Sequence, residues 1–155
     1  MTLMKPGLRK LMLFTHVATS VGLLGAVLSF LILIAAGLSD VGDQTMRGAY
    51  ITANLIAERV ILPLMLASLF VGVAEGLWTP WRLFKHRWVV AKLAITILAT
   101  AVLLIQMHPI GQLAGAALAG MPMDAGLQHR VLIHAVGGLL VLMVPVLLSV
   151  YKPVA

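Results

Sequence analysis

The sequence predicts an all-α integral membrane protein, a four-helix bundle with both termini on the cytoplasmic side. Hydrophobic residues make up 61% of the 155 positions and charged residues only 10%, whereas a soluble domain carries about 25% charged residues. Four apolar stretches each have roughly the 20 residues that are needed to cross about 30 Å of hydrocarbon. Basic residues gather on one side of these stretches, which gives the bundle a direction.

The first predicted span covers residues 11–38 and follows the basic residues Arg9 and Lys10. A cleaved signal peptide has a similar basic start, but its apolar core is only about 7–15 residues long. We therefore expect this helix to stay in the protein as an anchor.

The second predicted span covers residues 50–78 and the third covers residues 88–107. Trp78 and Trp88 flank the turn between them, and amphipathic indole rings favour the headgroup region of a membrane. Pro63 lies inside the second span, where its missing N–H group and its ring favour a kink.

The fourth predicted span covers residues 130–151 and is followed by Lys152. The preceding segment, residues 109–128, is rich in alanine and glycine and is too short to span the membrane. We expect it to form an outer loop, either as a short helix in the interface or as a lid over the outer end of the bundle. Residues 1–155 then make up a single transmembrane domain.

Basic residues divide unequally between the two sides of the predicted bundle. Eight of them fall on the side of the termini, namely Lys5, Arg9, Lys10, Arg82, Lys85, Arg87, Lys92 and Lys152. Three fall on the other side, namely Arg47, Arg59 and Arg130. The positive-inside rule then places both termini in the cytoplasm. The net charge of +6 is therefore a topology signal, and we expect contact with lipid headgroups rather than nucleic acid.

The chain contains no cysteine. This absence excludes disulfides, thiolate metal sites, iron–sulfur clusters and cysteine nucleophiles. Any metal ion or haem would have to be held by histidine, methionine, carboxylate, tyrosine or lysine side chains.

Small and polar residues mark the expected contacts between helices, because lipid-facing positions need only be apolar. In each span such residues recur at steps of three and four, which places them on one helix face. On the first two spans this face comprises Thr15, Thr19, Gly22, Ala26 and Ser29, with His16 and Ser20 beside them, and Asn54, Glu58, Ile61, Met65, Ser68, Gly72 and Glu75. On the last two spans it comprises Lys92, Thr96, Ala99, Leu103 and Gln106, and His134, Gly138, Val141, Pro145 and Ser149.

Polar residues of the predicted interior fall into two layers separated by an apolar middle. The inner layer comprises His16, Glu75 and Lys92, each within roughly 5–9 Å of the cytoplasmic edge on the helical rise. The outer layer comprises Glu58, Gln106, His108 and His134, with His129 just beyond it.

Each residue of the inner layer has a purely structural interpretation. Lys92 can extend to the headgroups, Glu75 can pair with a nearby cation, and His16 can form a hydrogen bond to Ser20. Ionisable groups inside a membrane are nevertheless costly and usually functional. We therefore expect the inner layer to bind a redox cofactor, haem b, through His16 with Lys92 and Glu75 beside it.

The outer layer also allows two interpretations. Its histidines can be ordinary interfacial residues, or His108, His134 and Glu58 can hold a divalent metal ion. A haem held between His108 and His134 is a further alternative. His16 and His134 lie roughly 15 Å apart in depth on the helical rise, so they are not expected to ligate the same haem.

Parts of the chain also resemble known membrane proteins. The segment Phe14-Thr15-His16-Val17-Ala18 resembles the histidine-bearing first helix of a bacterial group that includes HemJ-type protoporphyrinogen oxidases and the membrane domain of copper-resistance protein D. The segment from Trp88 through Lys92-Leu93 to His108 resembles another helix of that group.

This resemblance implies haem b as a cofactor, with His16 and Lys92 as the functional pair. The oxidases carry an arginine and an aromatic–histidine element at the end of their first helix, where this chain reads Ala35-Ala36-Gly37-Leu38. Protoporphyrinogen oxidation is therefore not implied. Over nearly its full length, including its ending Leu148-Ser149-Val150-Tyr151-Lys152-Pro153, the chain resembles a four-helix bacterial membrane family without an assigned activity, which implies the bacterial inner membrane as its location.

Three functional hypotheses follow from the sequence. The first is a small redox or cofactor-binding membrane protein whose partner is a quinone or another membrane protein. The second is a non-enzymatic membrane subunit or a small transporter-like protein that handles metal ions or protons. The third is a structural accessory protein whose polar residues only pack helices. Whether the protein is an enzyme, and whether it forms a homodimer through glycine-rich faces, stays open at this point.

Overall fold

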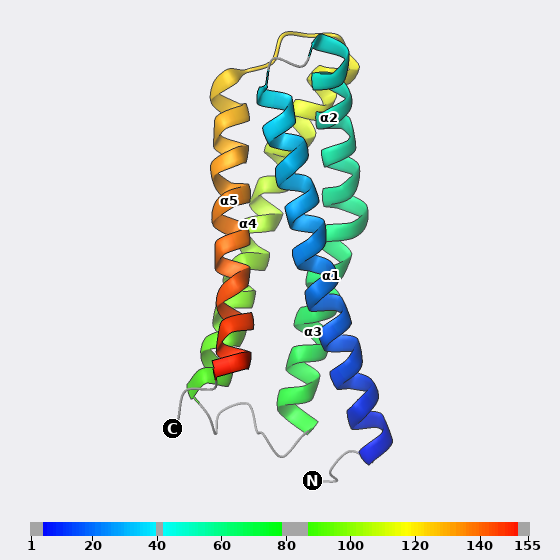
Figure 1. Ribbon diagram of the computed structural model, residues 1–155, viewed down its shortest axis with the longest axis vertical. Helices are drawn as coiled ribbons and strands as arrows, with labels where there is room; N and C mark the ends of the chain where they lie inside the picture. The colour runs from blue at the N-terminus through cyan, green and yellow to red at the C-terminus, as the bar shows by residue number, and fades with distance from the viewer. Residues whose placement is uncertain (1–4, 40–41, 79–86, 152–155) are drawn as a thin grey trace.

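The structure, a computed structural model, describes residues 5–39, 42–78 and 87–151. These residues form an all-α four-helix bundle, which confirms the predicted fold class (Figure 1). The helices are α1 (Pro6–Leu38), α2 (Asp43–Ile56), the π-helical turn η1 (Ala57–Ile61), α3 (Leu62–Trp78), α4 (Arg87–Leu118) and α5 (Ala125–Tyr151). Helices α2, η1 and α3 follow one another without a break and form one rod.

Within the described ranges, four helical segments are long and apolar enough to cross a membrane. They are Pro6–Leu38, Asp43–Leu77, Trp88–Leu118 and Ala125–Ser149. The start of α1 and the end of α5 lie at the same end of the bundle, which we call the base (Figure 1). The opposite end, where α1 and α4 end and where α2 and α5 begin, is called the top.

The bundle is longer than the hydrocarbon layer that it crosses. Helix α1 has 33 residues, which is about 50 Å at 1.5 Å per residue, compared with about 30 Å of hydrocarbon. The exposed residues Glu58 and Arg59 lie about 28 Å along the rod from Trp78 on the helical rise. They mark the far edge of the hydrocarbon, so the amphipathic helix α2 extends beyond it toward the top.

The predicted outer loop at residues 109–128 is wrong over its first half. Helix α4 continues through Pro109 to Leu118, because Leu113 and Ala117 bury their side chains in the core where α4 packs against α2. The stabilisation from this packing is larger than the cost of the one backbone hydrogen bond that a proline removes. Helix α4 ends at Leu118, and Gly120 in the turn that follows has a φ of +67°, which suits a residue without a Cβ atom.

A π-helical turn lies directly before Pro63. The N–H of Leu62 donates to the carbonyl oxygen of Ala57, five residues earlier. A proline ring collides with the carbonyl group four residues before it in a regular α-helix, so the wider turn relieves this conflict. The helix thus adapts to Pro63, where a kink was expected, through a π-helical turn. Such turns often lie at functional sites.

The buried face of α1 differs from the predicted one. Its buried residues are Leu23, Val27, Phe30, Ile34 and Gly37, whereas Gly22 and Ser29 are exposed. The hydroxyl of Ser29 donates to the carbonyl oxygen of Gly25 at 2.9 Å. A serine that is satisfied within its own helix can face lipid without a partner on another helix, and the small-residue pattern therefore misplaced this face.

Candidate functional site

The structure brings the predicted inner layer together near the base of the bundle. Lys92 on α4 interacts electrostatically with Glu75 on α3 and with His16 on α1. Its Nζ donates a hydrogen bond of 2.6 Å to Oγ of Ser149 on α5 and lies 5.4 Å from the ring centroid of Trp88. The inner layer thus draws on α1, α3 and α4, and Ser149 ties it to α5.

His16 packs into a notch on α3. A Cβ atom on Gly72 would lie only 3.2 Å from Cε1 of the imidazole, so the glycine makes room for the ring. The Nδ1 atom is buried near the backbone of Ser68, but it has no hydrogen bond of good geometry among the described residues. One turn further along α1, the hydroxyls of Ser20 and Ser68 lie 3.0 Å apart and join α1 to α3.

A cavity of about 370 Å³ lies between the four helices, on the top side of the inner layer. It is almost entirely apolar and includes residues of the π-helical turn in its wall. Along α4 it extends from Leu98 to Ile110, which is about 18 Å on the helical rise. Its volume is within the range of sites that hold small ligands. The cavity was not expected from the sequence.

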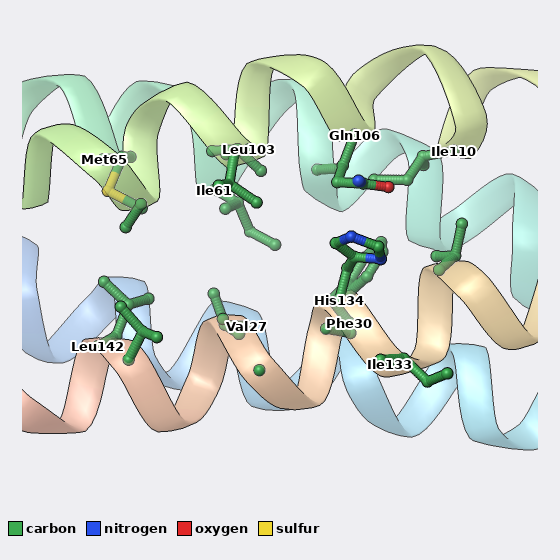
Figure 2. Close-up of a pocket in the computed structure, with 18 of the residues that line it drawn as sticks. Val27, Phe30, Ile61, Met65, Leu103, Gln106, Ile110, Ile133, His134 and Leu142 are labelled. Carbon is green, nitrogen blue, oxygen red and sulfur yellow. The ribbon is translucent and has the colours of Figure 1, made fainter. Parts of the chain in front are cut away.

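Two polar side chains point into this cavity from facing helices (Figure 2). Gln106 on α4 is only 8% exposed, and its Oε1 atom has no hydrogen-bond partner among the described residues. His134 on α5 lines the cavity at an exposed position and has its Nδ1 atom 2.7 Å from the carbonyl oxygen of Arg130. Since a carbonyl oxygen can only accept, Nδ1 carries the proton and Nε2 of the neutral ring is left as an acceptor.

The predicted outer metal site is not supported. Glu58 is exposed and accepts a hydrogen bond of 3.2 Å from Nδ2 of Asn54. His108 is exposed and does not line the cavity, because two residues after Gln106 a helix presents nearly its opposite side. Across the described ranges, no group of three or more histidine or acidic side chains is arranged to hold a metal ion. His129 is also exposed, with Nδ1 2.8 Å from the carbonyl oxygen of Ala125.

Buried polar groups continue from the cavity toward the top. The hydroxyl of Tyr50 approaches the buried side chain of Gln128 without a hydrogen bond of good geometry, and Oδ1 of Asn54 is likewise buried without a partner among the described residues. Buried polar atoms are normally hydrogen-bonded to protein, water or ligand. The sequence interpretation missed Tyr50 and Gln128, because a single polar residue in a helix outside the hydrocarbon carries no signal of burial.

Arg47 joins α2 to the end of α4. Its guanidinium group forms an ion pair of 2.8 Å with Asp43 and donates to the carbonyl oxygens of Ala117 at 3.4 Å and Met121 at 3.1 Å. Carbonyl groups at a helix end lack partners within the helix, so a cation there stabilises the end. This contact anchors the top of the bundle.

Comparison with known proteins found no relative, because no protein-family model, curated protein or solved structure matches this chain. Function must therefore be argued from the geometry of the inner layer and of the cavity. The resemblance described above stays an expectation.

Proposed function

We propose that this protein binds a membrane quinone or quinol in the cavity between its four helices. The observation that carries the proposal is the pair Gln106 and His134, which are the two polar side chains in an otherwise apolar cavity (Figure 2). Sites for small ligands typically combine an apolar wall with a few convergent polar groups. The pair would orient a ring whose polar substituents need hydrogen bonds.

Gln106 can pair with both forms of such a ring, and His134 can pair with the reduced form. The amide group of Gln106 can donate to a quinone carbonyl, and its Oε1 can accept from a quinol hydroxyl. Nε2 of His134 can accept from a quinol hydroxyl, since Nδ1 is held by the carbonyl of Arg130. A ligand hydroxyl at this place would also satisfy the buried Oε1 atom of Gln106.

The test is calorimetric titration of the purified protein in detergent with a short-chain quinone and with its quinol. We expect Gln106→Leu to weaken binding of both ligands and His134→Leu to weaken binding of the quinol, each by about tenfold, because one hydrogen bond contributes about 1–1.5 kcal/mol. The matched control is His129→Leu, which removes an exposed imidazole outside the cavity. Equal affinities for all four proteins would contradict the proposal.

We further propose that the base of the bundle faces the cytoplasm and that the membrane is a bacterial inner membrane. Among the described residues, basic residues are more numerous near the base than near the top, as the positive-inside rule requires of the cytoplasmic side. Gln106 lies about 27 Å along α4 from Trp88 on the helical rise, which is nearly the thickness of the hydrocarbon. The polar end of the cavity would then lie at the outer leaflet.

Haem b at the inner layer is a second candidate. His16 offers a buried ring nitrogen without a hydrogen-bond partner among the described residues, and Lys92 and Glu75 lie within electrostatic range of each other. His16 and Lys92 would hold the haem, through the iron and through a carboxylate of the group respectively, and the haem when bound would supply one-electron chemistry. A Soret band that is lost in His16→Ala and kept in His134→Ala would support this candidate. A protein without a haem absorption band would exclude it and leave the quinone proposal untouched.

A further inference from the structure

The residues that line the cavity are buried on one side of it and partly exposed on the other. Its residues from α1, η1 and α3 are all buried, namely Val27, Phe30, Ala57, Ile61 and Met65. Every exposed residue of the wall comes instead from α4 or α5, including Leu98 at 62% and Ile133 at 66%. The cavity therefore opens along the seam between α4 and α5.

Two adjacent glycines of α5 keep this side of the cavity empty. Gly137 and Gly138 both line the cavity, and a Cβ atom on either would meet nothing within 4 Å. Gly37 and Gly72 are different, because neighbouring rings fill the space beside them. In membrane bundles glycine usually permits close helix contact, but here it leaves open volume next to the backbone.

The open side faces hydrocarbon rather than water. Leu98 lies about 15 Å along α4 from Trp88 on the helical rise, which is the middle of a bilayer about 30 Å thick. Four exposed residues of the wall are apolar, namely Leu98, Val102, Ile133 and Val141, and the exposed polar one is His134. A molecule that passes between α4 and α5 would therefore come from the lipid phase.

We propose that the ligand of this cavity carries a long hydrocarbon chain, which leaves the cavity between α4 and α5 and lies in the bilayer. This inference rests on the proposed function, because it takes the polar ring to lie at Gln106 and His134. A cavity of about 370 Å³ holds a ring of a quinone and only the first part of an isoprenoid chain. The remaining chain has to continue through the open seam.

The first test compares a chain-bearing quinone with a ring-only analogue in detergent micelles. Leu98→Trp narrows the seam at an exposed position, and the matched control is Leu104→Trp, because Leu104 is also on α4, is 52% exposed and does not line the cavity. We expect Leu98→Trp to weaken binding of the chain-bearing ligand by about tenfold and binding of the ring-only ligand by less than about twofold. Leu104→Trp should leave both affinities unchanged.

Equal effects of Leu98→Trp on the two ligands would overturn the lateral opening while leaving the ring site intact. Failure of the ring-only analogue to bind the wild-type protein would overturn the proposed function itself. A second measurement uses a photoreactive group at the end of the chain, followed by mapping of the labelled peptides. Labelling of α4 and α5 around Leu98 and Val141 is expected, and labelling confined to the lipid-facing side of α1 would overturn the proposal.

Discussion

The ring of Tyr50 on α2 fills the space beside Gly37 on α1, so that a Cβ atom on Gly37 would lie 2.6 Å from its Cζ atom. Tyr50 is only 1% exposed, so a Cβ atom on Gly37 would press against an enclosed ring. We expect Gly37→Ala to destabilise the protein by about 1–3 kcal/mol through overpacking. Thermal unfolding in detergent measures the change. Gly25→Ala is the control, because a Cβ atom there meets nothing within 4 Å, and an equal stability of the two variants would show that Tyr50 does not constrain α1.

Lys92 and Ser149 form a second contact that joins two helices, here near the base. Removing either side chain should weaken the joint between α4 and α5, since the Nζ–Oγ hydrogen bond of 2.6 Å is made within the membrane. We expect a double-mutant cycle of Lys92→Met and Ser149→Ala to give a coupling free energy of about 0.6 kcal/mol, which is typical of such bonds. The comparison cycle pairs Lys92→Met with Ser29→Ala, whose hydroxyl bonds within α1. Coupling in the second cycle and none in the first would contradict the described contact.

Arg47 is expected to hold the end of α4 in place. Arg47→Met removes the donors to the carbonyl oxygens of Ala117 and Met121, which should lower the unfolding free energy by about 1 kcal/mol. Backbone amides at the end of α4 should then exchange faster with deuterium, as mass spectrometry can measure. Arg59→Met, a change at an exposed position on the same rod, should leave that exchange unchanged.

Much of this fold can be predicted from the sequence, because apolar stretches report directly on the lipid environment. The four spans and the grouping of His16 with Lys92 follow from hydropathy and helical rise alone. The extension of α4 through Pro109 does not follow, since it depends on Leu113 packing against another helix. A hydropathy pattern locates the part of a helix that lies in lipid, and it gives no information on how far the helix continues into water.

The candidate site is predictable only in part. Gln106 and His134 each stand out as polar residues on an interior face of their own span. Their cavity depends on the combined side-chain volumes of four helices, which no single helical pattern contains. The adjacent glycines Gly137 and Gly138 were the available signal, but glycine in a membrane helix more often indicates close packing than empty space.

The orientation of the bundle can be tested by cysteine labelling, because the chain contains no cysteine of its own. Gln44→Cys and Met121→Cys place a thiol at exposed positions near the top, and Lys10→Cys places one near the base. We expect a membrane-impermeant maleimide to label the first two in intact cells. The third should be labelled only after the membrane is permeabilised. The reverse pattern would show that the base faces outward.

The central claim is that a quinol hydroxyl bonds to His134 inside the cavity, and nitrogen NMR of the imidazole tests it most directly. With ¹⁵N-labelled histidine and His134→Gln for assignment, Nε2 of His134 should give the resonance of an unprotonated acceptor in the ligand-free protein. We expect this resonance to move when a short-chain quinol is added, while the resonances of His129, which does not line the cavity, stay unchanged. Saturating quinol binding without any shift at His134 would contradict the account.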